Sequence, residues 1–411
     1  MQRTPKGLRL HIGVFGRRNA GKSSFVNAMT GQAVSIVSDV AGTTTDPVEK
    51  AMEMLPLGPV LFIDTAGIDD TGALGEQRIG KTRGIIDRTD VAVILVTPDG
   101  WGRYETDLIE NFQKAEVPVI AVLNKSDLSP PCPEAVDYLH ERKLPVLHMS
   151  CTQATGVAEF KKTLLGIAPD SFLQPQTILG DLVEPGEMVV LVVPIDLEAP
   201  KGRLILPQVQ TIRDILDSDL TCAIAKEREL RSLLENLKQK PALVVTDSQA
   251  FLKVAGDTPP DIPMTSFSIL FARNKGDLQT FVNGVRVIDQ LKSGDKVLIA
   301  EACTHHPIGE DIGRVKIPRW MSQYVGGKLH FDVFSGSEFP ENLTEYKLVI
   351  HCGSCMFNRK QVLTRILKCR EAGVPITNYG LCIAYSLGIF ERALSPFQHM
   401  LDGNALKQSD R

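Results

Sequence analysis

One short segment has the residue types and spacing of a phosphate-binding loop. Residues 16–23 fit the pattern G-x-x-x-x-G-K-[ST], between an apolar run that predicts a strand and a segment that predicts a helix. Glycines let the backbone N–H groups of such a loop face phosphate oxygens, while Lys22 can reach the β- and γ-phosphates and Ser23 can bind Mg²⁺. A chance match is the alternative, which the strand–loop–helix context disfavours. The expected nucleotide-binding positions in and beside the loop are Gly16, Asn19, Ala20, Gly21, Lys22, Ser23 and Ser24.

Two motifs after the loop have residue types that suit Mg²⁺ and the γ-phosphate. Asp64 ends an apolar run at 60–63, where its carboxylate can bind the Mg²⁺ shell, and the N–H of Gly67 can contact the γ-phosphate. Thr44 lies in the run Thr43-Thr44-Thr45-Asp46, between the phosphate loop and Asp64, where a switch threonine that binds Mg²⁺ is expected. We assign catalytic roles to Lys22, Thr44, Asp64 and Gly67.

Two further motifs predict which base is bound. Asn124-Lys125-Ser126-Asp127 follows the apolar run 117–123, and the carboxylate of Asp127 can accept two hydrogen bonds from guanine N1–H and its exocyclic amine. Adenine lacks this donor pair, so such a site can discriminate by up to ~10⁴–10⁵. Ser150 and Cys151 follow another predicted strand and can offer backbone N–H groups to the base. Each tetrapeptide is common alone, but four motifs in this order predict a GTPase.

The same motifs resemble the TrmE-Era-type GTPases. The resemblance is carried by Gly42 to Asp46, by Asp64-Thr65-Ala66-Gly67-Ile68 and by Asn124 to Asp127. Ile68 stands where Ras-like enzymes have a catalytic Gln, so intrinsic activation of water should be poor. In relatives, an Asn at the position of Asn19 helps to bind K⁺, which replaces an arginine finger. The alternative, a loop residue that bonds its own backbone, stays open for Asn19.

Cysteines and histidines form a second cluster of chemistry near the C-terminus. Cys303-Thr304-His305 and His351-Cys352-Gly353-Ser354-Cys355 each follow a predicted strand, and 48 residues separate Cys303 from Cys352. The C-terminal ends of parallel strands converge on one crevice, so three thiolates and nearby imidazoles could meet there. This set suits zinc or an iron–sulfur cluster equally. A redox-active or incidental CxxC, with buried or solvated histidines, is the alternative. The other five cysteines, which include Cys151, are expected to pack as small apolar side chains.

The whole chain resembles the HydF family, the maturation GTPases of FeFe-hydrogenase, through the N-terminal GTPase motifs and the C-x-H … H-C-x-x-C signature. The resemblance implies that Cys303, Cys352 and Cys355 ligate a 4Fe-4S cluster, with His305 or His351 at the fourth position or near an exchangeable site. Ser354 replaces a glycine that members often have. The resemblance also implies a transient di-iron precursor cluster, two radical-SAM maturases that build it, and apo FeFe-hydrogenase that receives it.

The pattern of strands and helices predicts an α/β protein of three domains. Residues 1–170 are expected to form a P-loop GTPase domain with a mostly parallel sheet, and residues 266–411 an α/β iron–sulfur domain. Residues 171–265 predict a middle α/β unit, which the resemblance implies is a dimerisation domain. Its apolar run Met188 to Val193 could be an interface strand or a central strand of its own sheet. No sequence repeat is evident.

Composition sets the class of protein and its compartment. The 411 residues are 43% hydrophobic and 23% charged, with a formal net charge of −4, as expected of globular domains. The near balance of basic and acidic residues disfavours a protein that binds nucleic acid mainly by electrostatics. No apolar run is long enough to span a membrane. We therefore expect a cytoplasmic protein. The motifs predict that it binds GTP/GDP and Mg²⁺, and the two resemblances imply K⁺, a 4Fe-4S cluster and a homodimer. Two alternatives remain: an Era-like RNA or ribosome-assembly GTPase with structural zinc, and an iron–sulfur enzyme with a regulatory GTPase domain.

Overall fold

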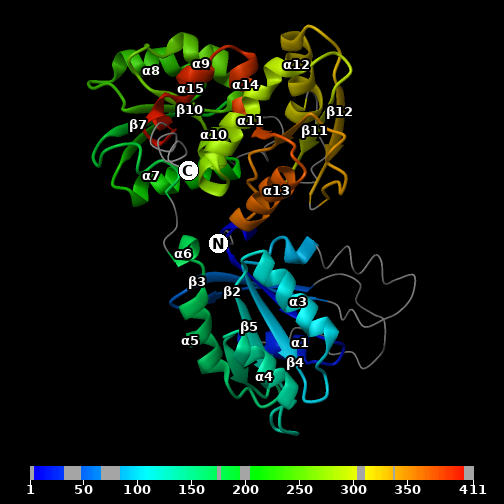
Figure 1. Cartoon of the computed structure of the whole chain (residues 1–411). Coiled ribbons are helices and arrows are strands. Elements are labelled where there is room, and N and C mark those ends of the chain that lie inside the picture. The colour runs from blue at the N-terminus through cyan, green and yellow to red at the C-terminus, as the bar shows by residue number, and fades with distance from the viewer. Residues whose placement is uncertain are drawn as a thin grey trace. The chain divides into compact units, whose positions relative to one another are not determined.

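The computed structural model describes residues 4–31, 48–65, 84–173, 177–194, 204–302, 311–336 and 338–401. The chain divides into two compact units, Met1–Pro175 and Gln176–Arg411 (Figure 1). Each unit is α/β, as the sequence predicts. Within the described ranges, none of the helices combines the length and the apolar character that crossing a bilayer requires.

The first unit is built on one six-stranded sheet of order β2-β3-β1-β4-β5-β6. All neighbours are parallel except β2, which runs antiparallel to β3. This confirms the mostly parallel sheet. The strands are β1 (Leu10–Phe15), β2 (Val48–Met54), β3 (Gly58–Asp64), β4 (Val91–Val96), β5 (Val119–Leu123) and β6 (Val146–His148). The helices are α1 (Lys22–Thr30), α3 (Arg103–Lys114), α4 (Pro133–Glu141), α5 (Val157–Ile167) and α6 (Asp170–Leu173).

Apolar residues cover both faces of this sheet, which is why its strands β1, β3, β4 and β5 are largely hydrophobic. One core includes Phe25 of α1 and Phe160 of α5, whose rings meet edge to face with centroids 5.0 Å apart. The other core packs Phe15 of β1 against Phe112 of α3 at 4.9 Å. The parallel strands β1, β3, β5 and β6 end on the same edge, so the motifs that follow them share that edge.

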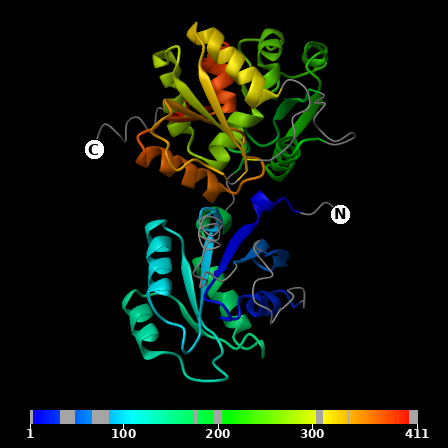
Figure 2. The same ribbon diagram turned by 90° about the vertical axis from the view of Figure 1, so that its right-hand side faces the viewer.

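The second unit contains two four-stranded sheets, both wholly parallel (Figure 2). The first has the order β10-β9-β7-β8 and the second β12-β11-β13-β14. The strands are β7 (Met188–Val192), β8 (Thr221–Ala225), β9 (Leu243–Thr246), β10 (Met264–Ser266), β11 (Lys296–Ala300), β12 (His330–Phe334), β13 (Leu348–His351) and β14 (Ile376–Asn378). One continuous core joins residues of both sheets.

The helices of this unit follow its strands along the chain. They are α7 (Leu206–Asp217), α8 (Leu230–Asn236), α9 (Phe251–Asp257), α10 (Phe267–Lys275), α11 (Leu278–Val285), α12 (Ile317–Val325), α13 (Arg359–Glu371), α14 (Tyr379–Ser386) and α15 (Phe390–Leu394). Short 3₁₀ turns occupy Lys6–Leu8 in the first unit and Ser248–Ala250, Arg286–Gln290 and Ser395–Phe397 in the second, and a π-helical turn, Ile312–Lys316, precedes α12. The strand β7 lies between β9 and β8 with most of its side chains buried, so it is central to its sheet, not an interface strand.

The two sheets of the second unit repeat one topology. Each places its first strand between the second and the third, with the fourth outside the third. The last strand and helix of each repeat also align in sequence, because residues 262–272 read IPMTSFSILFA and residues 374–384 read VPITNYGLCIA. The amide of Val244 bonds to the carbonyl of Pro263 in the first repeat, as that of Val349 bonds to Pro375 in the second. The expectation of no repeat was therefore wrong.

Candidate functional site

The phosphate loop joins β1 to α1. Its lysine bonds to carbonyl oxygens of the loop itself, and its serine bonds to the aspartate at the end of β3. Lys22 Nζ donates to the carbonyl oxygens of Gly16 at 2.7 Å and Arg17 at 2.8 Å. Ser23 Oγ donates to Asp64 Oδ2 at 2.6 Å. Burial raises the pKa of the Asp64 carboxyl, and Ser23, Lys22 and Lys50 oppose that rise. Two of the three oxygen ligands proposed for Mg²⁺, Ser23 and Asp64, thus lie side by side although they come from different elements.

Two positive φ angles show why the loop needs its residue types. Gly21 has φ +93°, and a Cβ there would lie 2.3 Å from Asn124 Nδ2. A side chain at this position would therefore break the packing of the loop against Asn124. Asn19 has φ +59°, a left-handed conformation that asparagine tolerates better than most residues. The residue type at position 19 therefore has a backbone reason that is independent of any ion.

Asn124 connects three parts of the nucleotide site. Its Nδ2 donates to the carbonyl oxygen of Ala20 at 2.8 Å, and its Oδ1 accepts from the backbone N–H of Cys151 at 3.1 Å. The asparagine is buried, whereas Asp127, three residues later, is exposed, as a residue that reads a base must be. Burial raises the pKa of the Cys151 thiol to about 12, so this cysteine packs as an apolar side chain. Ser150 is also buried, and its backbone N–H donates to the hydroxyl of Thr155.

One residue of the loop has a role that sequence reasoning missed. Arg17 makes a two-point ion pair with Glu105 of α3, with Nε–Oε1 at 2.8 Å and Nη2–Oε2 at 2.9 Å. The Glu105 side chain is fully buried, so this pair fixes the loop to the helix. A glutamate in the first turn of a helix is a common helix-starting residue, so the sequence carried no signal for the contact. Thr44 and Gly67 lie outside the described residues.

The loop that follows β13 contains Cys352 and Cys355 and lies beside the end of β11. Ala300 pairs with His351 across the two strands, and the backbone N–H of Cys352 donates to Ala300 O at 3.0 Å. Cys352 Sγ accepts from the N–H of Ala302 at 3.0 Å and from that of Ser354 at 3.5 Å. Ala302 directly precedes Cys303 in the sequence, and Cys303 and His305 lie outside the described residues. The two predicted strand ends therefore do meet.

A buried hydrogen-bond network around His351 stabilises this cysteine loop. His351 Nε2 lies 3.0 Å from Nη1 of Arg365 on α13, and His351 Nδ1 lies 3.0 Å from both the Ser354 hydroxyl and the Cys352 carbonyl oxygen. Arg365 also donates to the carbonyl oxygens of Gly336 and Glu338. Burial and the positive charge of Arg365 lower the pKa of His351 to about 3. His351 is therefore a neutral, fully packed ring.

A buried lysine supports the loop from the other repeat. Lys275, the last residue of α10, donates through Nζ to the carbonyl oxygens of Phe357 at 2.7 Å, Ser354 at 2.9 Å and Cys355 at 3.3 Å. Burial lowers the pKa of Lys275 to about 8, and the thiolates of Cys355 and Cys352 oppose that shift. Burial raises the pKa of Cys355, whereas Lys275 and two backbone N–H groups lower it. Sequence reasoning did not connect Lys275 with the cysteines, because 76 or more residues separate them.

The described residues of the cysteine loop bear on which metal group the site could hold. Within the described ranges, no three Cys, His, Asp or Glu side chains converge as a metal site. The loop nevertheless fits an iron–sulfur cluster. The loop contains two thiols three residues apart, and backbone N–H groups donate to the Cys352 sulfur. The buried ammonium group of Lys275 can balance the negative charge of the thiolates. Soft thiolate donors suit zinc as well, so the geometry of the described residues leaves both metals open.

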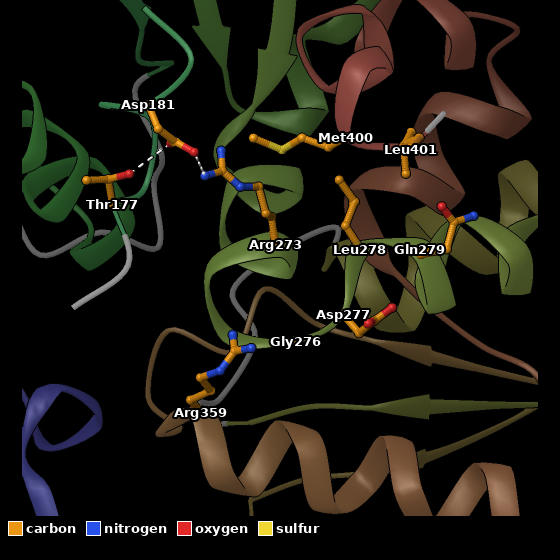
Figure 3. A pocket seen from close by; sticks show the side chains of 10 residues that line it. All are labelled: Thr177, Asp181, Arg273, Gly276, Asp277, Leu278, Gln279, Arg359, Met400 and Leu401. Atoms are coloured by element: carbon orange, nitrogen blue, oxygen red, sulfur yellow. Dashed lines mark hydrogen bonds and ion pairs between the residues drawn. The ribbon is translucent and has the colours of Figure 1, made fainter. Parts of the chain in front are cut away.

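A cavity of about 360 Å³ lies on the side of α10 where Arg273 projects (Figure 3). Arg273 pairs there with Asp181, which also accepts from the hydroxyl of Thr177. Arg359 lines the same cavity and donates to the carbonyl oxygen of Asn274 at 2.6 Å. Two arginines and two aspartates, Asp181 and Asp277, line the cavity, so its charges balance.

Fold and site together define the first unit as a P-loop GTPase domain. A protein-family model described as "50S ribosome-binding GTPase" matches residues 11–125. Two others match the second unit, "Hydrogen maturase F dimerization domain" at residues 178–276 and "Hydrogen maturase F tetramerization domain" at residues 279–396. The last two models together cover more than half of the chain. The chain belongs to the hydrogen maturase F (HydF) family, and both of its HydF domains are of types named for self-association.

Known GTPases are similar to part of the chain. The chain is 36% identical over 160 residues to the tRNA modification GTPase MnmE of Paraburkholderia xenovorans, which covers 39% of this chain and 34% of that protein. It is 30% identical over 184 residues to the GTPase Era of Rippkaea orientalis, which covers 42% and 57%. The chain thus spans about a third of the length of the first of these relatives. A crystal structure of Era with MgGDPNP and part of 16S ribosomal RNA superposes with a TM-score of 0.36 at 20% identity, covering 61% of this chain and 98% of that one.

Proposed function

We propose that the chain hydrolyses GTP in its first unit and carries a 4Fe-4S cluster in its second, as a scaffold for maturation of FeFe-hydrogenase. The GTPase motifs support the first activity, because Lys22, Ser23 and Asp64 lie together as phosphate and Mg²⁺ ligands must. The observation that carries the second is the hydrogen bond from Ala302 N–H to Cys352 Sγ. It supports a site shared by Cys303 and the C-x-x-C loop, since Ala302 is the neighbour of Cys303 in sequence.

Three thiolates, those of Cys303, Cys352 and Cys355, would hold the cluster, which when bound supplies an iron–sulfur centre with one exchangeable position. The residues around it orient the loop, bury it and set its charge. N–H groups of Ala302 and Ser354 donate to the Cys352 sulfur and favour the thiolate. His305 stays a candidate for the exchangeable position, whereas the buried contacts of His351 favour a supporting role.

The same proposal assigns Mg²⁺ to Ser23, Thr44 and Asp64, and K⁺ to the loop at Asn19. The cargo is a di-iron precursor that two radical-SAM maturases build and that the chain transfers to apo FeFe-hydrogenase. Membership of the HydF family supports this cargo and these partners. We propose a homodimer or a higher assembly in the cytoplasm, with no nucleic-acid partner.

Metal content tests the cluster proposal directly. Anaerobic purification of the full chain should give a brown protein with about four iron atoms per chain for one such cluster, and an EPR signal after reduction. Cys352→Ser should lose most of this iron because serine is a poor iron ligand. Cys222→Ser, in the same unit but on the edge strand β8, is the matched control and should keep it. Stoichiometric zinc without iron would instead support the Era-like alternative.

Nucleotide selectivity tests the GTPase proposal separately. Asp127→Ala removes the exposed carboxylate that would accept two hydrogen bonds from guanine, so the preference for GTP over ATP should vanish. The expected loss lies within the ~10⁴–10⁵ range of such sites. Asp99→Ala, an exposed aspartate of the same unit outside all four motifs, is the control. If Asp127→Ala and the parent protein had equal selectivity, Asp127 would not be the residue that reads the base.

A further inference from the structure

We propose that Lys275 is a positioning residue of the cysteine site, which fixes the C-x-x-C loop through three carbonyl groups and holds a positive charge against the metal-binding thiolates. This rests on the proposed cluster site. It adds to that site a residue from the other repeat of the second unit. Lys275 ends α10, which lies in the part matched by the dimerisation model, whereas the cysteines lie in the part matched by the tetramerisation model.

The geometry accounts for every donor of the lysine. An ammonium group has three N–H donors and no acceptor, and the three carbonyl oxygens of Ser354, Cys355 and Phe357 surround Lys275 Nζ. The residue is only 3% exposed, so solvent does not replace these contacts. Burying a charge is costly unless it is paired and hydrogen-bonded, so a buried lysine with this set of acceptors is an ordered contact. A neutral side chain could not satisfy three carbonyl oxygens at one point.

The carbonyl contacts also decide which way the loop presents its N–H groups. A trans peptide is planar, with its C=O and N–H on opposite sides. The carbonyl groups of Ser354 and Cys355 turn toward Lys275, so the N–H groups of Cys355 and Met356 turn away from it. The lysine therefore sets the orientation of these two peptide groups of the C-x-x-C loop.

The charge of Lys275 acts on a bound cluster as well. Three thiolates and a cluster form an anionic centre, and reduction makes it more negative. A cation buried beside the thiolates stabilises the reduced form more than the oxidised form, because Coulomb energy is large where water is excluded. Lys275 should thus raise the reduction potential of the cluster. Arg273, two residues earlier on α10, carries the same charge but pairs with Asp181 in the cavity shown in Figure 3.

Three substitutions in the full chain separate these effects. Lys275→Met removes both the donors and the charge, Lys275→Gln keeps donors without charge, and Lys275→Arg keeps the charge but cannot place three donors at one point. Arg273→Met is the matched control, since it removes one positive charge from the same helix away from the cysteine loop. The first measurement is hydrogen–deuterium exchange of the loop 352–358 in metal-free protein, and the second is an EPR-monitored redox titration after anaerobic reconstitution.

We expect exchange of the loop amides at least tenfold faster in Lys275→Met than in the parent or in Arg273→Met. In protein reconstituted with the cluster, Lys275→Met and Lys275→Gln should lower the ratio of reduced to oxidised cluster about tenfold at a fixed potential. For one electron, this corresponds to a reduction potential about 59 mV more negative than that of the parent. Lys275→Arg should keep the parent potential. If Lys275→Met does not fold, the Gln and Arg variants still test the charge.

Failure of this inference is distinct from failure of the proposed function. Parent-like exchange of the loop in Lys275→Met, or a parent-like potential in Lys275→Gln, would overturn the role of Lys275 while the cluster itself remained established. A parent protein that binds no iron would overturn the proposed cluster instead, and the exchange measurement would still decide whether Lys275 fixes the loop.

Discussion

The Nε2 atom of His351 lies 3.0 Å from the Nη1 atom of Arg365. A guanidinium can only donate, so Nε2 is the acceptor and the ring proton sits on Nδ1, where the carbonyl oxygen of Cys352 and the hydroxyl of Ser354 lie within 3.0 Å. Both ring nitrogens are thereby occupied, and no lone pair faces a metal. We infer that His351 orients the cysteine loop and does not ligate.

His351→Asn should therefore keep the iron content of the reconstituted protein. It should lower the free energy of unfolding of the second unit by about 1–3 kcal/mol, because it disturbs buried hydrogen bonds with Arg365 and the loop. Iron per chain and a denaturant melt of the same sample give the two values. His330→Asn, an exposed histidine on β12, serves as the control. Loss of iron in a folded His351→Asn protein would restore this histidine as a ligand.

Ser354 has φ +57°, a left-handed conformation that costs a residue with a Cβ about 1–2 kcal/mol. Its hydroxyl compensates, because it contacts His351 Nδ1 and the Cys352 carbonyl oxygen. Ser354→Ala loses these bonds and keeps the strain, whereas Ser354→Gly loses the bonds and relieves it. Thermal unfolding should rank the parent above Gly and Gly above Ala, with about 1 kcal/mol between the two variants. Equal stability of Ala and Gly would contradict the strain.

His11 gives the first unit a predictable acid sensitivity. Burial, aided by the positive charge of Arg88, lowers its pKa to about 4, although its ring nitrogens face the carbonyl oxygens of Lys6 and Arg88, and Glu49 lies near. The unfolded chain binds a proton below pH 6.5 while the folded unit does not until about pH 4. The free energy of unfolding should thus fall as pH falls through this window, by about 1.4 kcal/mol per pH unit.

Denaturant melts between pH 7 and pH 4 measure this slope. His11→Gln cannot bind the proton, so its stability should change less steeply with pH, even if it is lower throughout. The carboxyl group of Glu49 titrates in both proteins, so its contribution cancels in the difference. His140→Gln, an exposed histidine of α4, should retain the parent slope. Parallel curves for His11→Gln and the parent would exclude His11 as the cause.

Much of the nucleotide site could be predicted because its motifs are local. The strand and helix predicted on either side of the phosphate loop are β1 and α1, the apolar run 60–63 lies in β3, and the run 117–123 ends with β5. The contact of Ser23 with Asp64 follows from the convergence of parallel strand ends, which the apolar runs already indicate. Arg17–Glu105 could not be foreseen, because a buried ion pair between a loop and a distant helix leaves no pattern in either segment.

The cysteine site could be predicted only in part, for a related reason. Cys352 and Cys355 were visible from their spacing, whereas Lys275 and Arg365 support them through backbone and ring contacts that depend on packing. The short strands β8, β10, β12 and β14 were missed. With them the repeat was missed, although Pro263 and Pro375 begin matching segments. Three-residue strands such as β10 and β14 are too short for an apolar period to be recognised.

Asn19 offers a test of K⁺ dependence that controls for backbone strain. If its side chain binds K⁺, the GTP hydrolysis rate should be several-fold higher in K⁺ than in Na⁺ at equal ionic strength. Asn19→Gly keeps the left-handed φ of +59° without cost but removes the amide, so the parent's response to K⁺ should disappear while nucleotide binding persists. A parent protein that is indifferent to the cation would leave Asn19 with a backbone role alone.

The two proposed activities should separate by unit. The phosphate loop lies in Met1–Pro175 and every proposed cluster ligand lies in Gln176–Arg411, and each compact unit has its own core. Lys22→Ala removes the cation of the phosphate loop, so GTP hydrolysis should fall at least 100-fold, on the order expected for losing a transition-state contact. Iron content and the cluster spectrum should stay as in the parent, since thiolates retain the cluster.

Cys352→Ser should show the converse, with iron lost and GTP hydrolysis retained, because Mg²⁺ and phosphate binding need no cysteine. Both variants should fail to activate apo-hydrogenase if transfer needs the cluster site and a nucleotide-driven step together. Iron per chain, GTP hydrolysis rate and hydrogenase activation are measured on the same preparations, with Cys222→Ser as the folded cysteine control. A folded Cys352→Ser protein that no longer hydrolyses GTP would mean that the two sites are obligately coupled. The independent cores of the two units make that outcome the unexpected one.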